Sequence, residues 1–390
     1  MKIILPKEVK KILSVLNQSG FETYIVGGCV RDILMGKAPH DFDITTSATP
    51  EQIKSLFNKT ADTGIKHGTV TVIENGIPFE VTTFRTESGY TDLRRPDKVY
   101  FVKDIKKDLS RRDFTMNAIA CSLNGEITDP FGGQTDIINK VIKTVGDPYK
   151  RFSEDALRIL RLFRFSSALD FSPEKNTLNA ALTLTNELNK ISTERIVSEL
   201  KKTVCSDSPE NSMPLFETKA LSFLGIENCP KLDNLKHIRK NTELRMFVFL
   251  KLSTKNVYKT SKELKLSRKE TDKISDLLYI EENLKSEEKA DIKTVLSKLK
   301  YPEIFDDFID YAKIYSRFNS EKLKANYNEI LNNKEPYKIS DLAVDGSFIT
   351  AFGISGQEVG NELYRLLRMV IKNPELNRKE LLLKMINKGN

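Results

Sequence analysis

The chain has 390 residues, of which 39% are hydrophobic, and it carries a net charge of +8 with a pI near 9.0. This length allows two or more domains with cores of their own, and no apolar run approaches the roughly 18 residues of a membrane span. The positive charge suits a polyanionic partner, although lysine-rich solvated helices give the same total. Four widely spaced cysteines indicate neither a disulfide scaffold nor a zinc site, which favours the cytoplasm.

Two helices are predicted near the N-terminus. The first covers residues 6–17, has a proline at its first turn, and places four apolar side chains on one face: Val9, Ile12, Leu13 and Leu16. The second begins at Thr49, which can cap it while Gln52 reaches back in a capping box.

A glycine turn follows the first predicted strand. The apolar run 24–26 leads into Gly27-Gly28, where backbone N–H groups can face a triphosphate without hindrance from side chains. Arg31 then opens a short helix that ends near Gly36. The turn is therefore a candidate phosphate cradle.

Two aspartates come shortly after this turn. Asp41 and Asp43 are two residues apart, and strand residues at i and i+2 share a face, so both carboxylates can reach one metal cluster while Phe42 and Ile44 face the core. Phosphoryl transfer to a hydroxyl commonly uses two divalent ions about 3.5 to 4 Å apart. Hard oxygen ligands beside a phosphate substrate favour Mg²⁺.

Hairpins dominate the rest of the first 147 residues. Residues 69–74 and 77–84 flank Asn75-Gly76, a similar pair surrounds Asn124-Gly125, and 141–145 reads as a last short strand before the pattern ends at Gly146. Residues 1–147 are therefore predicted to form an α+β domain with a mixed sheet. Glu80, in the second strand, either lies on the solvent face or supplies a third carboxylate beside the aspartates.

The segment from Arg111 to Ala118 combines paired guanidinium groups with an acid and an amide. Arginine forks bind phosphate in a bidentate manner, and Asp113 or Asn117 could hold ribose hydroxyls. Arg112 is therefore a candidate for nucleotide binding. The alternative is a basic turn in which Asp113 caps a helix.

From Ser153 onward the pattern is helical, with Ser153 as the predicted N-cap of a helix through residue 165 and a further helix after Ser192. The helix that starts at Ser153 carries a polar stripe that repeats every three residues and consists of Asp155, Arg158, Arg161 and Arg164. An ordinary amphipathic helix would show the same spacing.

The first two members of the stripe, Asp155 and Arg158, suit base selection. Cytosine and adenine both present an exocyclic amine beside an unprotonated ring nitrogen. A carboxylate that accepts from the amine and a guanidinium that donates to the nitrogen would select C and A over U and G.

In order along residues 22 to about 200, these motifs resemble those of the bacterial class II tRNA nucleotidyltransferases, the CCA-adding enzymes, in the poly(A) polymerase-like branch of the polymerase β superfamily. The match includes Asp129-Pro130-Phe131-Gly132-Gly133 and Glu194-Arg195-Ile196. The resemblance implies a seahorse-shaped fold with a polymerase β-like catalytic head and helical neck, body and tail. Their expected bounds are 1–147, 148–205, 206–290 and 291–390.

The same resemblance implies template-independent addition of C, C and A to the 3′ acceptor end of tRNA from CTP and ATP, with no stable protein partner and no membrane. The neck would recognise the base, and the body and tail would bind tRNA. Asp41 and Asp43 would bind Mg²⁺. The nucleotide would be bound by Gly28, Arg31, Arg112, Asp155, Arg158, Arg161 and Arg164.

Residues 86–100 are polar and turn-rich and are similar to the family's flexible loop, which argues against an enzyme that adds only C. The loop does not separate CCA-adding from A-adding enzymes. The sequence leaves three alternatives open: an A-adding enzyme, a bacterial poly(A) polymerase, and an RNA-binding protein with an inactive head.

Overall fold

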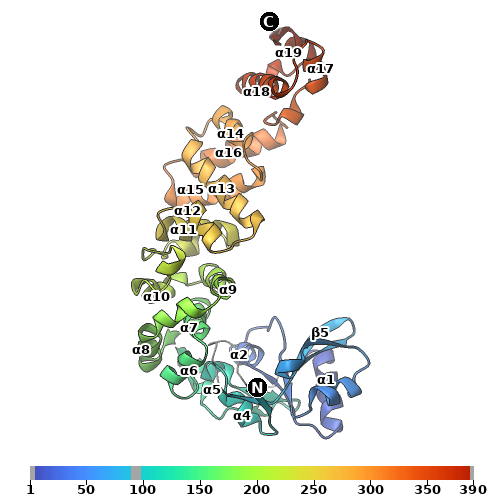
Figure 1. The fold of residues 1–390 in the computed structure, drawn as a ribbon, viewed down its shortest axis with the longest axis vertical. Coiled ribbons are helices and arrows are strands. Elements are labelled where there is room, and N and C mark those ends of the chain that lie inside the picture. Colours follow the sequence, from blue (N-terminus) through green and yellow to red (C-terminus); the bar gives the residue numbers. More distant parts are fainter. Residues whose placement is uncertain (1–4, 89–97, 387–390) are drawn as a thin grey trace. The chain divides into compact units, whose positions relative to one another are not determined.

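The computed structural model describes residues 5–88 and 98–386, and the chain divides into two compact units, Met1–Asp233 and Asn234–Asn390. The main sheet lies in the blue to teal first part of the ribbon, and the later part is almost entirely helical (Figure 1). The predicted α+β class is confirmed. No helix in the described ranges is long and apolar enough to cross a membrane.

The main sheet has the strand order β3-β4-β5-β2-β1-β8-β9. Strands β2 and β5 run parallel, whereas β1 is antiparallel to both of its neighbours, so the sheet is mixed as predicted. Its strands are β1 (Thr23–Val26), β2 (Ile44–Thr46), β3 (Thr60–Gly64), β4 (Thr69–Glu74), β5 (Ile77–Thr83), β8 (Ala120–Ser122) and β9 (Ile127–Thr128).

Both predicted hairpins are confirmed. Asn75 and Gly76 join β4 to β5 with φ values of 52° and 81°, the left-handed pair that a tight two-residue turn requires. Asn124-Gly125 joins β8 to β9. A separate two-stranded sheet pairs β6 (Arg85–Ser88) with β7 (Lys98–Phe101), and the predicted flexible loop between them lies largely outside the described residues.

The predicted strand 141–145 is only partly right. Its regular part, β10 (Val141–Ile142), does not join the main sheet but pairs in parallel with β11 (Ser172–Pro173). The expectation that no strand follows Gly146 was therefore wrong. A two-residue pairing is too short to leave a period in the sequence.

The helices of the first domain support the sheet. Helix α1 buries the four predicted side chains, and the capping box of α3 at Thr49 and Gln52 is present. Helix α2 begins at Gly28 rather than at Arg31, because the carbonyl of Gly27 already accepts a hydrogen bond from the backbone N–H of Arg31 at 3.1 Å. These helices are α1 (Lys7–Gln18), α2 (Gly28–Leu34), α3 (Pro50–Leu56), α4 (Ile105–Ser110) and α5 (Gly133–Ile138).

The next helices depart from the sequence prediction at one point. Ser153 does not cap a helix; it lies inside α6, which is capped by Asp147 and has Pro148 at its first position. The chain is extended at Asp155, with φ −145° and ψ 102°, before the next helix starts. The helices are α6 (Pro148–Glu154), α7 (Leu157–Leu169), α8 (Lys175–Thr183), α9 (Thr193–Val204) and α10 (Met213–Glu217).

The second unit is helical throughout its described part. Its helices are α11 (Thr242–Ser253), α12 (Val257–Glu263), α13 (Arg268–Asn283), α14 (Lys289–Leu296), α15 (Phe305–Tyr315), α16 (Ser320–Asn332), α17 (Gly346–Thr350), α18 (Gln357–Lys372) and α19 (Lys379–Met385). One core cluster near the C-terminus includes Ile349, Leu366 and Leu382. The division into units falls after Asp233, and the boundaries at 147, 205 and 290 stay predictions.

Candidate active site

Asp41 and Asp43 lie just before β2, which begins at Ile44. The backbone N–H of Val26 donates to the carbonyl of Asp43 at 3.0 Å, so the end of β1 and the glycine turn lie beside the second aspartate. Ile44 is buried as predicted, whereas Phe42 is only half-buried. The pairing of β1 with β2 thus brings the candidate phosphate cradle next to a carboxylate.

Glu80 lies on the neighbouring strand. In the parallel β2–β5 pair, Ile44 is opposite Val81, so Asp43 and Glu80 occupy the preceding position of the register. Asp41, Asp43 and Glu80 all line one cavity of about 610 Å³. The three carboxylates therefore share one cavity.

The electrostatics of Asp43 reflect this crowding. Its carboxylate keeps contact with solvent, but surrounding protein desolvates it and raises its pKa. The guanidinium of Arg112 acts in the opposite direction, and the charges of Asp41 and Glu80 raise the pKa further. Such mutual repulsion between carboxylates is relieved when a cation binds.

Whether a metal ion fits this site depends on the carboxylate oxygens of Asp41, Asp43 and Glu80. Within residues 5–88 and 98–386, no group of three or more histidine, cysteine, aspartate or glutamate side chains is arranged to hold an ion. Asp41 and Asp43 nevertheless offer hard oxygen ligands on one open cavity, and phosphate oxygens of a substrate can complete such a shell. The residues therefore fit a divalent cation that binds together with a phosphate ligand.

Arg112 lies against the glycine turn. A Cβ atom on Gly27 would come within 2.9 Å of Arg112 Nη1 and 3.8 Å of Asp43 Oδ2, and Gly27 also has a φ of 82°. Only glycine allows this approach and this backbone conformation. In the described part of the chain, the buried Nε of Arg112 has no hydrogen-bond partner, so this arginine retains a donor for a ligand.

Asp108, on α4, anchors both arginines of the predicted phosphate-binding segment. Its side chain is fully buried and accepts from Arg111 Nε at 3.0 Å and Arg111 Nη2 at 2.9 Å. It also accepts from the backbone N–H of Arg85 at 3.2 Å and lies 3.6 Å from Arg112 Nη2. Asp108 is not among the residues predicted from the sequence, although its position three and four residues before the arginines was a usable signal.

Arg31 points into the protein interior. It donates to Asn117 Oδ1 at 2.7 Å and to Asp32 Oδ1 at 2.7 Å, and its guanidinium lies 5.3 Å from the centre of the Phe165 ring. A Cβ on Gly28 would be 3.6 Å from Arg31 Nη2, an ordinary contact distance, so Arg31 packs directly over this part of the turn. Arg31 therefore ties the glycine turn to α7.

Asp113 is neither a free ribose ligand nor a helix cap. Burial alone would raise its pKa, but Arg161 donates to Oδ2 at 2.8 and 2.6 Å and holds the pKa well below its usual range. Arg164 pairs with Glu199 at 2.6 Å and lies 4.0 Å from the centre of the Phe165 ring. Arg161 and Arg164 thus both have carboxylate partners, and both lie near the same Phe165 ring.

Asp155 and Arg158 do not pair with each other. Asp155 accepts from Arg195 Nη2 at 2.9 Å, while Arg158 donates to Glu154 Oε2 at 2.9 Å and to the carbonyl of Arg111 at 3.0 Å. The last contact links α7 directly to the arginine segment of the first domain. The structure thus brings Asp155 and Arg158 to the joint between α6 and α7, each held by a separate partner.

Three further side chains that hold this region were not predicted: Glu154, Arg195 and Glu199. Arg195 belongs to the Glu194-Arg195-Ile196 motif, so the sequence marked it without indicating its partner. Its contact with Asp155 spans 40 residues of chain. Pairings over such separations leave no local pattern.

Comparisons with known proteins show what the chain is similar to. Residues 23–143 match the family described as "Poly A polymerase head domain", and residues 170–225 match "Probable RNA and SrmB- binding site of polymerase A". The CCA-adding enzyme of Lactobacillus helveticus (strain DPC 4571) is 36% identical over 379 residues, which cover 93% of this chain and 92% of the relative. That of Ligilactobacillus salivarius (strain UCC118) is 37% identical over 405 residues, with 98% and 97% covered.

A solved structure supports the same relationship. The crystal structure of the Bacillus stearothermophilus CCA-adding enzyme in complex with CTP matches with a TM-score of 0.84 and 30% identity. The match covers 98% of this chain and 97% of that chain.

Proposed function

The chain belongs to the CCA-adding enzymes, a family of tRNA nucleotidyltransferases, and on that premise we propose how its residues complete the 3′ end of a tRNA. The enzyme adds C, C and A in turn from CTP and ATP and releases pyrophosphate at each addition. The observation that carries the residue assignment is the convergence of Asp41, Asp43 and Glu80 on one cavity beside the glycine turn.

In each addition the terminal hydroxyl of the tRNA attacks the α-phosphorus of the nucleotide. A bond forms between that oxygen and phosphorus, and the bond to the β-phosphate oxygen breaks. Two Mg²⁺ ions held by Asp41 and Asp43, with help from Glu80, would supply activation of the hydroxyl and neutralisation of the triphosphate. Mutual repulsion of the carboxylates around Asp43 favours cation binding there.

The triphosphate and sugar are positioned by the glycine turn and two arginines. The backbone at Gly28 opens α2, whose first N–H groups are unpaired within the helix and can donate hydrogen bonds to an anion. Arg112 contributes the positive charge of its guanidinium, whose Nη1 lies against Gly27 and which interacts with the charge of Asp43. Arg31 holds this turn against Phe165 and Asn117.

The base is selected by Asp155 and Arg158. Each carboxylate oxygen carries two lone pairs, so Asp155 can still accept from an exocyclic amine while it accepts from Arg195. In the described part of the chain, Arg158 uses Nη1 and Nη2 for protein contacts, which leaves its Nε–H for a ring nitrogen. Arg161 and Arg164 support this geometry through Asp113 and Glu199.

The remaining segments fit the same function. We assign base recognition to residues 148–205 and tRNA binding to residues 206–290 and 291–390, supported by the net charge of +8. We place the enzyme in the cytoplasm, which agrees with the free thiols of all four cysteines in the described part of the chain.

The test uses three tRNA substrates that end before CCA, after the first C, and after CC, each incubated with CTP, ATP or both. Finished CCA from the shortest substrate establishes the full activity. Extension only of the substrate that ends in CC would indicate an A-adding enzyme, and long adenosine tails would indicate a poly(A) polymerase. No incorporation on any substrate would refute the proposed function.

A further inference from the structure

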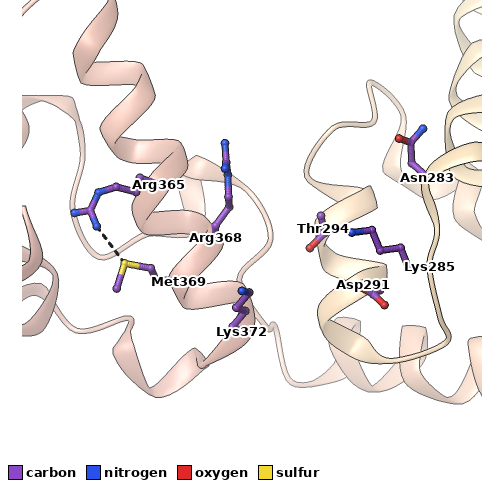
Figure 2. A pocket seen from close by; sticks show the side chains of 8 residues that line it. All are labelled: Asn283, Lys285, Asp291, Thr294, Arg365, Arg368, Met369 and Lys372. Atoms are coloured by element: carbon purple, nitrogen blue, oxygen red, sulfur yellow. Dashed lines mark hydrogen bonds between the residues drawn. The ribbon is translucent and has the colours of Figure 1, made fainter.

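The second unit contains a basic cleft that adds no separate site. It lies between α18 and the segment formed by α14 and the end of α13, with Arg368 and Lys372 on one wall and Lys285 on the other (Figure 2). The cleft belongs to the segments already assigned to tRNA binding. The proposed steps give no role, in contrast, to the ring of Phe165 in the first unit, although it contacts three of the arginines on which those steps depend.

Phe165 lies in the second half of α7 and packs against the first domain. Its side chain is 7% exposed, and its ring meets that of Phe114 edge to face, with centroids 5.9 Å apart and an interplanar angle of 87°. Phe114 is fully buried and belongs to the arginine segment 111–118. The aromatic pair therefore joins α7, which carries Arg158, to the domain that contains the glycine turn.

Three guanidinium groups lie against the Phe165 ring. Those of Arg31 and Arg161 are each 5.3 Å from its centre, and that of Arg164 is 4.0 Å from it. The face of an aromatic ring attracts cations within about 6 Å. Arg31 comes from α2, which begins at the glycine turn, whereas the other two arginines come from α7 itself. One ring thus contacts cations from both α2 and α7.

These three cations repel one another. Burial lowers the pKa of the Arg164 guanidinium, and the nearby charges of Arg161 and Arg31 lower it further. Each arginine has its own carboxylate partner at 2.6 to 2.7 Å, and the partners lie on separate elements: Asp32 on α2, Asp113 after α4 and Glu199 on α9. These ion pairs hold the arginines individually, whereas the Phe165 ring is in contact with all three.

A chain of hydrogen bonds would survive the loss of the ring. Arg31 donates to Asn117 Oδ1 at 2.7 Å, and Asn117 Nδ2 donates to Asp113 Oδ1 at 3.2 Å. Arg161 donates to the other oxygen of Asp113. A smaller apolar side chain at position 165 would therefore leave each guanidinium with a polar partner but without its aromatic support.

We propose that Phe165 is a positioning residue for nucleotide transfer, whose ring fixes the glycine turn, through Arg31, against the helix that carries Arg158. The proposal rests on the proposed function, in which the turn holds the triphosphate and Arg158 reads the base. A complete nucleotide spans both places, whereas a bare triphosphate needs only the turn. The ring therefore affects the binding of CTP and ATP and not that of an inorganic ligand of the turn.

The test compares Phe165→Leu with Phe163→Leu in the full-length enzyme. Both variants replace a buried phenylalanine of α7 by the same residue, but in the described part of the chain no guanidinium lies over the ring of Phe163. For Phe165→Leu we expect the KM for CTP and ATP to rise roughly tenfold, while the inhibition constant of inorganic tripolyphosphate changes by less than about twofold. For Phe163→Leu both quantities should stay within about twofold of the wild type.

The KM for tRNA is measured in the same assays and should not change in either variant. If Phe165→Leu does not fold, Phe165→Met carries the same comparison, because its flexible side chain fills irregular space. A parallel loss of CTP and tripolyphosphate binding would overturn the positioning role, since the turn itself would then be damaged. Equal KM values for CTP in the two leucine variants, in enzymes that still complete CCA, would also overturn it and leave the proposed function intact.

Discussion

At the scale of single residues, Gly27 decides how closely the candidate phosphate cradle approaches the carboxylates that we propose to bind metal. Any side chain at this position would meet Arg112 Nη1 at 2.9 Å, and the φ of 82° disfavours other residues. The backbone hydrogen bond from Val26 to Asp43 then sets the separation between the turn and the second aspartate. The reaction centre therefore depends on main-chain contacts as much as on its carboxylates.

Asp43→Ala should abolish the incorporation of both CTP and ATP, with a loss of about three orders of magnitude or more, because it removes a carboxylate that would hold the ions. The loss of incorporation is measured by single-turnover extension of tRNA that ends before CCA. Asp62→Ala, which removes an exposed carboxylate of the same domain, is the control and should retain activity. Substantial incorporation by Asp43→Ala would refute the metal assignment.

Asp108→Asn tests whether this buried carboxylate positions Arg111 and Arg112. The amide keeps the shape but lacks the charge, so we expect the KM for CTP and ATP to rise about tenfold while the KM for tRNA stays constant. Asp104→Asn at the exposed cap of α4 should change neither value, since both residues cap helices well. Equal increases in the nucleotide and tRNA KM values would indicate a general loss of structure instead.

At the scale of elements, the joint between α6 and α7 is the main departure from the sequence prediction. The periodicity predicts one helix from Ser153, yet Asp155 is extended. Its side chain accepts from the backbone N–H of Leu157 at 3.1 Å, a local contact that competes with the helical pattern. Because of this break, Asp155 does not lie on α7 with the three arginines of the predicted polar stripe.

Asp155→Asn combined with Arg158→Gln should relax base selection. Amides both donate and accept, so they can pair with the carbonyl and N–H edges of uracil and guanine. We expect incorporation of UTP and GTP to rise relative to CTP and ATP, measured on tRNA that ends before CCA and after CC. In Asp147→Asn, at the cap of α6, the preference should not move. An unchanged preference in the double variant would remove the base-selection role.

Asp307 on α15 gives a pH dependence of stability. Burial raises its pKa from 3.8 to about 6, although Arg239 lies 2.7 Å away. The folded state then keeps a proton that the unfolded state releases, so the free energy of unfolding falls as pH rises from about 4 to 6.

Asp307→Asn should remove this dependence and raise the free energy of unfolding at neutral pH by on the order of 2 kcal/mol. The free energies of unfolding of the wild-type protein and the variant are compared by thermal unfolding at pH 5 and pH 7.5. Asp306→Asn, whose carboxylate is 59% exposed and also pairs with Arg239, serves as the control. A wild-type protein that gains stability between these pH values would contradict the predicted sign.

At the scale of the whole molecule, the chain has a net charge of +8. Its two kinds of substrate, tRNA and nucleoside triphosphates, are both polyanions but differ greatly in size. Binding of tRNA releases many more counterions than binding of CTP. Between about 50 and 200 mM salt we expect the KM for tRNA to rise by about a hundredfold and that for CTP to rise much less. Parallel rises in steady-state assays would show that the charge does not act mainly on tRNA.

The shared cavity of the candidate reaction centre could be predicted because its residues are close in sequence or lie on paired strands. Asp41 and Asp43 are two apart, and the hairpin at Asn75-Gly76 places Glu80 on a strand with a readable alternation. The long-range contacts of the anchoring side chains could not be predicted. Asp108 reaches Arg85 across 23 residues and Arg195 reaches Asp155 across 40, and neither contact leaves a periodic signal.

The sequence by itself determined the family, the α+β class and the kinds of side chain at the reaction centre, because local spacing, turn chemistry and motif order depend only on neighbouring residues. Only the tertiary structure decided where α6 ends, that Asp155 and Arg158 have separate partners, and that α14 and α18 form a basic cleft. These features depend on packing between distant segments, and packing is set by complementarity of shape and charge that no single stretch of chain contains.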